Sequence, residues 1–300
     1  HGWLLLVAWF SGGMMALLGA LSTAELATRF PHTGGDFIYL FHVYGKVPAF
    51  LYGWISLTVT GPGSVAILAL FSAKYILAFL SVTNFEINSE IFTAGGIVLV
   101  LTILHCFKVT VGSRFQSMLT VLKVGGVTLL AIYLLNMDVG TEIIQNPETG
   151  NSLKGFSKAL IPIFFAYSGW NCVGYIAGEV NNPNKTLPKA FIFGTILVTS
   201  LYVLLNTGFL NVMGIAAMQG EPLIPIKALE TVSNSRAVML VNLLILVSVF
   251  SSLSIIIQTS ARILQSMGEK RVLFPKLAET HPKANTPVFA LTLQAFLAIV

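Results

Sequence analysis

One lysine lies in the middle of a long apolar run. Lys123 stands between Leu122 and Val124, and no other charged residue occurs from Phe115 to Tyr133. An isolated cation at the midplane of a bilayer costs about 3 kcal/mol on insertion scales, so it must face other helices or a water-filled cavity. Lys123 is therefore either a working cation or a structural one whose ammonium is satisfied by carbonyls at helix ends.

The apolar run 156–180 carries small and polar residues at its midpoint, where a lipid-facing helix would carry leucine. It contains Pro162, then the segment 165–171 (FAYSGWN), then Gly174 and Gly178. One interpretation is a kink at a helix-packing interface, since small residues let helices approach closely. The other is a discontinuous helix whose free carbonyls and amides would bind a charged ligand. Non-helical backbone at that depth is tolerated where it lines a cavity.

Hydroxyl side chains gather in two further runs. The run 237–266 carries Ser248, Ser251, Ser252, Ser254, Thr259 and Ser260, and the run 47–80 carries Thr58, Thr60 and Ser64 beside Gly61 and Gly63. Hydroxyls on one helix face can bond a neighbouring helix or a ligand, and packing is the more common role.

The sequence gives little support for a metal site or for a catalytic set of residues. The five histidines are scattered without the spacing of metal ligands, and Cys106 and Cys172 form no CxxC pattern. No Ser-His-Asp set or phosphate-cradling glycine loop occurs at a plausible depth. We therefore expect no enzyme, catalytic residue, metal or cofactor. The basic loops are short and explained by membrane topology, so nucleic acid is not an expected partner.

Composition identifies the class of protein. Of the 300 residues 55% are hydrophobic and 10% are charged, and the mean hydropathy is +0.82. A typical soluble domain has about 25% charged residues. So few charges exclude a cytosolic enzyme and a disordered chain. The sequence predicts an all-α, polytopic helical membrane protein, with the lipid bilayer as a partner.

About 20 apolar residues cross the hydrocarbon core as a helix. We expect about seven complete spans and the start of an eighth, within one transmembrane domain over 1–300. These spans are 3–27, 47–80, 91–107, 115–135, 156–180, 190–213, 237–266 and 287–300. The second run is too long for one perpendicular crossing, so it is strongly tilted or bent at Gly61-Pro62-Gly63. Because apolar runs reach both ends, we expect a fragment of a longer protein.

The basic residues set the orientation. Eleven of the 17 lysines and arginines fall on the side of the loops 28–46, 108–114, 181–189 and 267–286. The positive-inside rule places this side in the cytoplasm. We expect a multi-pass integral protein of the plasma (inner) membrane.

Several segments resemble those of a known family. They are 19–36 (GALSTAELATRFPHTGGD), 62–67 (PGSVAI), 73–75 (AKY), 165–171 (FAYSGWN), 179–183 (EVNNP), 187–190 (LPKA), 259–262 (TSAR) and 274–276 (FPK). In this order they resemble the amino acid–polyamine–organocation permeases, and most closely the L-type amino-acid transporters. The similarity extends over nearly the whole chain.

The resemblance implies two inverted five-helix repeats, with helices one and six broken at a central substrate site. The chain would then run from the second helix to the start of the ninth, a fragment lacking the first and the C-terminal helices. It implies that carbonyls near Phe165, Ala166 and Ser168 receive the substrate ammonium, that Phe165 also gates the pocket, and that Asn171 lines it.

The same resemblance implies roles for four more residues. Lys123 would replace a sodium ion and bridge toward helix one and the hydroxyl of Ser252. Val59 and Ser64 would meet the substrate side chain. Gly61 stands where many relatives have arginine, and the loop 81–90 lacks the cysteine with which animal members join a heavy-chain glycoprotein, so no disulfide-linked heavy chain is expected.

The leading hypothesis is a secondary transporter of amino acids that works by alternating access, as an exchanger or a proton-linked carrier. A polyamine or cationic-amine carrier on the same fold is the alternative, although it predicts mid-depth carboxylates that the spans lack. A channel or a non-transporting sensor is an alternative of another class.

Overall fold

The computed structural model describes residues 2–79, 87–107, 109–137, 152–221, 223–232 and 235–300. The described residues form helices and turns, with no strand among them, as the composition predicts. The α-helices are α1 (Gly2–Arg29), α2 (Asp36–Tyr44), α3 (Lys46–Ile55), α4 (Gly61–Phe79), α5 (Ile87–Cys106), α6 (Val109–Leu135), α7 (Ser152–Ala166), α8 (Cys172–Tyr175), α9 (Pro183–Met218), α10 (Ile224–Thr231), α11 (Ser235–Glu269) and α12 (Val288–Ile299). Three short segments have other helical geometry: η1 (Ser56–Thr60), η3 (Ala177–Glu179) and η4 (Pro275–Ala278).

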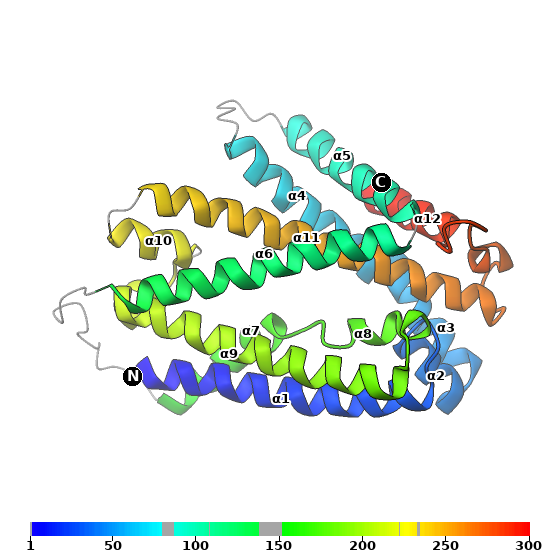
Figure 1. Ribbon diagram of the computed structural model, residues 1–300, viewed down its shortest axis with the longest axis horizontal. Helices are drawn as coiled ribbons and strands as arrows, with labels where there is room; N and C mark the ends of the chain where they lie inside the picture. The colour runs from blue at the N-terminus through cyan, green and yellow to red at the C-terminus, as the bar shows by residue number, and fades with distance from the viewer. Residues whose placement is uncertain (1, 80–86, 108, 138–151, 222, 233–234) are drawn as a thin grey trace. The chain divides into compact units, whose positions relative to one another are not determined.

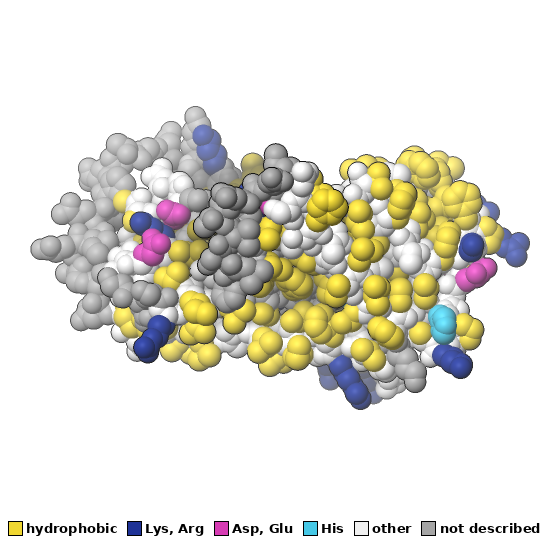
Figure 2. All heavy atoms as spheres, turned by 90° about the horizontal axis from the view of Figure 1, so that it is seen from above, with side chains coloured by type: hydrophobic (Ala, Val, Ile, Leu, Met, Phe, Trp, Pro, Cys, Tyr) yellow, Lys and Arg dark blue, Asp and Glu magenta, His cyan; other side chains and the backbone are white. Residues whose placement is uncertain are grey.

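Six helices of the described chain are long and apolar enough to cross a membrane. They cover Gly2–Arg29, Lys46–Leu77, Asn88–Cys106, Thr110–Leu135, Pro183–Met218 and Arg236–Glu269. Each corresponds to a span predicted from hydropathy. The other two predicted spans appear as the shorter apolar helices Gly155–Ala166 and Val288–Ile299. Figure 2 shows hydrophobic side chains spread over the visible face, with few charged groups between them.

The long second run contains a local change of helix type. Its residues Ser56–Thr60 form a π-helix, in which the N–H of Gly61 donates to the carbonyl of Ser56 instead of that of Leu57. Pro62 follows directly and has no N–H to donate to the carbonyl of Thr58. A π-bulge thus lies directly before the Gly61-Pro62-Gly63 segment, and whether the run is bent there or tilted stays a prediction.

The chain divides into two compact units. Unit 1 contains residues 1–23, 122–170 and 188–245, and unit 2 contains 24–121, 171–187 and 246–300. The chain leaves unit 1 and enters unit 2 at residue 171, inside the predicted broken helix.

Unit 1 has two apolar clusters. The larger is built on Leu134 of α6, Phe209 and Met213 of α9, and Leu229 of α10. The smaller joins Ala8 and Ala16 of α1 to Ile163 of α7, and it includes Tyr167 just beyond α7. The second cluster packs α7, the first limb of the predicted broken helix, against α1.

In unit 2, α4 packs against α5, and α12 contacts both of these helices. Many of its fully buried side chains come from α2 and α11, among them Phe37, Leu253, Ile257 and Met267. Met267 lies against Gly53 of α3, where a Cβ would come within 2.4 Å of its sulfur. Close packing of α3 and α11 therefore depends on the glycine.

Candidate functional site

The helix predicted to be broken is interrupted. The segment α7 ends at Ala166, residues 167–171 form turns, and α8 begins at Cys172. The irregular stretch between the labels α7 and α8 is visible in Figure 1. Gly169 has a φ of +108°, which an L side chain rarely adopts, so glycine is needed to turn the chain here. The structure confirms the discontinuous helix and not a simple kink.

The interruption leaves main-chain groups for a ligand. Within the described chain, the N–H groups of Gly169, Trp170 and Asn171 have no hydrogen-bond partner. The Phe165 carbonyl accepts the N–H of Ser168 at 3.1 Å and its hydroxyl at 2.7 Å. The Ala166 carbonyl accepts the hydroxyl of Tyr202 at 3.0 Å. Two of the carbonyls assigned to the substrate ammonium are thus already used by protein donors, whereas the three amides are available to an anion.

In unit 1, three aromatic residues hold the end of α7. The Tyr167 hydroxyl donates to the carbonyl of Trp9 at 2.9 Å, and Tyr202 reaches Ala166 as described above. The rings of Trp9 and Tyr202 lie 4.9 Å apart, and those of Tyr167 and Tyr202 lie 5.0 Å apart. Sequence reasoning missed Trp9 and Tyr202, because nothing in the pattern links α1 and α9 to residue 166.

In unit 2, the second limb of the broken helix is held by a polar cluster around Asp36. One carboxylate oxygen, Oδ2, accepts the amide of Asn171 at 2.7 Å and the hydroxyls of Tyr175 at 2.9 Å and Tyr52 at 3.2 Å. The hydroxyl oxygens of Tyr52 and Tyr175 are 2.8 Å apart, and Asn171 also donates to Tyr175 at 2.9 Å. Asn171 was predicted to line the pocket, and here its amide serves this cluster.

Tyr39 lies beside the same cluster. Its side chain is 5% exposed, and its hydroxyl has no hydrogen-bond partner among the described residues. Burial, and then the negative charge of Asp36, raise the pKa of the Tyr39 phenol well above its usual value. The phenol therefore stays neutral throughout the physiological pH range.

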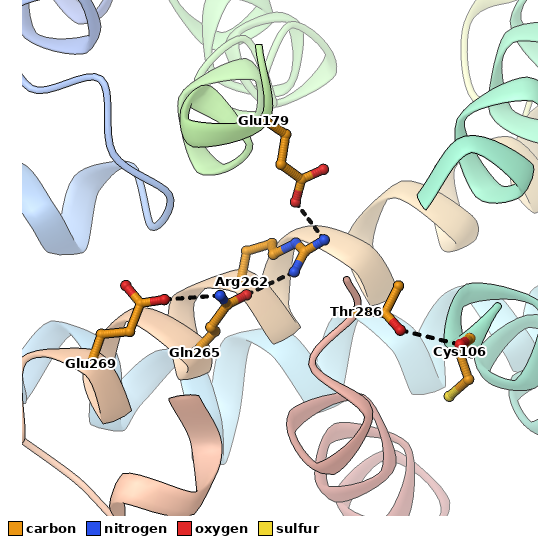
Figure 3. A network of polar contacts seen from close by, with 6 residues as sticks. All are labelled: Cys106, Glu179, Arg262, Gln265, Glu269 and Thr286. Carbon is orange, nitrogen blue, oxygen red and sulfur yellow. Dashed lines mark hydrogen bonds and ion pairs between the residues drawn. The ribbon is translucent and has the colours of Figure 1, made fainter. Parts of the chain in front are cut away.

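A second polar network lies at the C-terminal end of the second limb, around Glu179. The Arg262 guanidinium of α11 forms an ion pair with Glu179 and donates to the Gln265 side-chain oxygen at 2.7 Å. The Gln265 amide in turn donates to Glu269 at 2.8 Å. Figure 3 shows the guanidinium between Glu179 and Gln265. The sequence motifs contained Arg262 and Glu179 but gave no sign that they pair.

A small pocket adjoins this network. It is lined by His105, Gly112, Gln258, Ala261, Arg262, Thr286, Pro287 and Leu291. Thr286 donates to the Cys106 carbonyl at 3.1 Å (Figure 3). The pocket's polar lining groups are thus largely engaged with the protein.

The hydroxyls of α11 include helix-packing groups. In unit 2, the buried side chains of His105 and Ser254 lie 2.9 Å apart, and the amide of Gln116 donates to the Ser251 hydroxyl at 3.0 Å. Ser252 donates to the carbonyl of Ser248 at 3.1 Å, within its own helix. Packing, the commoner of the two interpretations, therefore holds for Ser251 and Ser254.

The remaining predicted site residues are divided between the two units. Phe165, which is 71% exposed, belongs to unit 1 together with Ala166 and the exposed Ser168. Val59, which is 61% exposed and lies in the π-bulge, belongs to unit 2 with the half-buried Ser64. Their joint role in one pocket stays a prediction.

Lys123 of α6 is half-buried in unit 1. In the part of the chain that the structure describes, its ammonium has neither a hydrogen bond nor an ion pair. Ser252 belongs to unit 2, so the predicted bridge between them stays a prediction. No group of three or more His, Cys, Asp or Glu side chains that could hold a metal occurs among the described residues.

Comparison with known proteins shows the same similarity over the whole chain. A profile described as amino acid permease matches residues 1–300. The serine/threonine exchanger SteT of Bacillus subtilis is 28% identical over 98% of this chain and 67% of its own length. The human b(0,+)-type amino acid transporter 1 is 35% identical over 69% of this chain and 44% of its own length. The human large neutral amino acids transporter small subunit 2 is 29% identical over 96% of this chain and 55% of its own length. The chain thus spans about half to two thirds of these relatives.

Proposed function

The chain belongs to the amino acid permease family, and we propose that it forms part of a carrier that moves amino acids across the membrane by alternating access. It is a multi-pass membrane protein with six helices of spanning length in its described part. The names of its relatives, a serine/threonine exchanger and two amino acid transporters, support amino acids as the cargo.

The interruption at residues 167–171 is the observation that carries this proposal. A zwitterionic amino acid brings two charges into a site that excludes water, and both need partners. The free N–H groups of Gly169, Trp170 and Asn171 would serve the carboxylate. The carbonyls near Phe165, Ala166 and Ser168 would serve the ammonium, which would replace the Ser168 hydroxyl at the Phe165 carbonyl and the Tyr202 hydroxyl at the Ala166 carbonyl. Backbone dipoles bind the cargo without a fixed side-chain charge that would trap it.

Lys123 would couple the occupancy of this site to the conformational change. A midplane ammonium without a protein partner in the described residues needs a second arrangement in which its charge is satisfied. In the carrier it would be paired in one conformation and hydrated in another. This role fits an exchanger as well as a proton-linked carrier.

The absence of a disulfide-linked heavy chain is proposed from the sequence alone. The loop 81–90 contains no cysteine, and residues 80–86 lie outside the described residues. Comparing reducing and non-reducing gels of the protein purified from its native membrane tests this point.

The test of transport uses the full-length protein in proteoliposomes. We expect uptake of a radiolabelled amino acid to saturate and to rise when the vesicles contain unlabelled amino acid or when the outside is acidic. Lys123→Ala should abolish this uptake or its dependence on the opposing gradient, whereas Lys158→Ala, which removes an exposed lysine of α7, should leave it unchanged. Failure of every amino acid to be taken up would reject transport, and unchanged coupled uptake by Lys123→Ala would reject the role of the lysine.

A further inference from the structure

We propose that hydrogen bonds accepted by Asp36 hold the second limb of the broken helix, residues 171–179, against α2 and α3, and that breaking these bonds is a step of the transport cycle. We call this set of hydrogen bonds the catch. The inference rests on the proposed transport function and adds a positioning residue to it. Asp36 would act through Asn171 and Tyr175 without touching the substrate.

The hydrogen bonds of the catch converge on one carboxylate oxygen of Asp36, the first residue of α2. Of the donors, Tyr52 lies in α3, Asn171 directly precedes α8, and Tyr175 ends α8. Their three donors meet Oδ2 of Asp36 at 2.7–3.2 Å. In the described residues the carboxylate has no Lys or Arg partner. Losing Asp36 would therefore remove the acceptor that all three side chains share.

Close backbone contacts surround the same point. The N–H of Gly34 donates to the carbonyl of Tyr175 at 3.0 Å. A Cβ on Gly35 would come within 2.3 Å of the Tyr175 ring, and one on Gly174 would come within 2.7 Å of the Tyr39 hydroxyl. The loop before α2 and the second limb thus lie against each other with little space between them. Besides the main-chain bond from Gly34 to Tyr175, the side-chain hydrogen bonds of the Asp36 cluster hold this contact.

The second limb, residues 171–179, is held by different interactions from the first limb, α7. The end of α7 is held in unit 1 by Trp9, Tyr167 and Tyr202. In unit 2, Asp36 accepts hydrogen bonds from Asn171 and Tyr175 of the second limb, and Arg262 pairs with Glu179 at its end. Gly169, with a φ of +108°, lies in the turn that precedes the second limb.

Polar bonds suit a catch that must open. When hydroxyl and amide donors move away from a carboxylate that water can reach, water molecules take their place. The free-energy difference between the hydrogen-bonded and the separated arrangement is therefore moderate. A permanently buried apolar contact offers no such exchange. The competing interpretation is a purely structural cluster that stays closed throughout the cycle, and it makes different predictions for accessibility.

Cys172 is a natural reporter for this test, because it follows Asn171 directly and is only partly exposed. In the full-length protein, with the other cysteines replaced by alanine, the rate of labelling by a membrane-impermeant maleimide would be measured from each side of the membrane. The variants are Asp36→Asn, Tyr175→Phe and the milder Tyr52→Phe. The matched control is Tyr39→Phe, which removes a buried hydroxyl beside the cluster that has no partner among the described residues.

We expect Asp36→Asn and Tyr175→Phe to raise the labelling rate from one side by about tenfold, because the first replaces the charged acceptor of three hydrogen bonds by a neutral, weaker one and the second removes one of the donors. Tyr52→Phe should give a smaller increase, since its bond to Asp36 is the longest. Tyr39→Phe should stay within about twofold of the unmodified protein. If Asp36→Asn does not yield folded protein by size-exclusion chromatography, the two tyrosine variants decide the outcome.

Labelling at the unmodified rate by the Asp36 and Tyr175 variants would overturn the catch, as would an equal increase in Tyr39→Phe. The labelling assay does not require transport. A changed labelling rate in a protein that takes up no amino acid would show that Asp36 holds residues 171–175, but it would refute the transport proposal and, with it, a role of the catch in transport. Normal uptake with unchanged labelling would refute the catch alone.

Discussion

The ion pair between Glu179 and Arg262 should make a large contribution to stability. The Arg262 side chain is 4% exposed and that of Glu179 is 24% exposed. Glu179→Ala leaves the guanidinium buried, with the neutral side chain of Gln265 as its hydrogen-bond acceptor. Removing one member of a buried pair costs about 3–5 kcal/mol, and the partial exposure of Glu179 favours the lower end, about 3 kcal/mol. The cost arises from the uncompensated charge that remains and not from the lost attraction alone.

The measurement is the temperature at which the full-length protein in detergent loses its monodisperse peak. A domain of a few hundred residues shifts by about 2–4 °C per kcal/mol, so Glu179→Ala should lower this temperature by about 6–12 °C. The control is Glu25→Ala, which breaks the exposed pair with Arg29, whose N–O distance is 2.5 Å and whose side chains are 63% and 68% exposed. An exposed pair contributes about 0–1 kcal/mol, so the shift should be small.

A double variant separates the two causes of instability. Glu179→Leu with Arg262→Met removes both charges and fills the space with apolar atoms, and replacing a buried pair in this way is often neutral. We therefore expect the double variant to recover most of the loss. A shift for Glu179→Ala no larger than that for Glu25→Ala, or a double variant as unstable as the single one, would refute the reasoning.

Two further predictions use the same heating assay. Gly178→Ala should destabilise the protein by about 1–3 kcal/mol, because the new Cβ would lie 2.5 Å from the Thr33 hydroxyl and 3.0 Å from its backbone nitrogen. The control Gly96→Ala, which has open space around its Cβ, should be neutral or stabilising. Equal effects of the two substitutions would contradict this account. Tyr202→Phe removes the donor to the Ala166 carbonyl and should cost about 1 kcal/mol, with faster hydrogen exchange at the end of α7; unchanged exchange there would show that the bond does not hold this limb.

The spans could be predicted from local sequence. Apolar runs of spanning length predicted the six long helices, because the length of such a run reflects the thickness of the hydrocarbon core. The small and polar residues of the segment 165–171 predicted an irregularity at that depth but left a kink and a discontinuous helix open, and the resemblance implied the break that the structure contains. The motif resemblance identified the family over the same residues.

The partners of the broken helix could not be predicted in this way. In the sequence, Asp36 stands out only as the last residue of the motif 19–36. Its hydrogen-bond partner Asn171 lies 135 positions further along the chain. The family resemblance implies that Asn171 lines the pocket, and this stays a prediction; the structure adds that its amide donates to Asp36. Glu179 and Arg262 stood in separate motifs, and Trp9 and Tyr202 stood in none that concerned residue 166.

The amino-acid sequence by itself determined the membrane class, the positions of the helices and the point where one of them breaks. These properties depend on the free energy of transfer into lipid and on backbone preferences, which are local quantities. The tertiary structure alone decided which side chains fasten each limb of the broken helix. Hydrogen bonds between distant segments depend on packing that brings a few polar groups within about 3 Å, and periodicity along one helix carries no record of the residue that faces it from another.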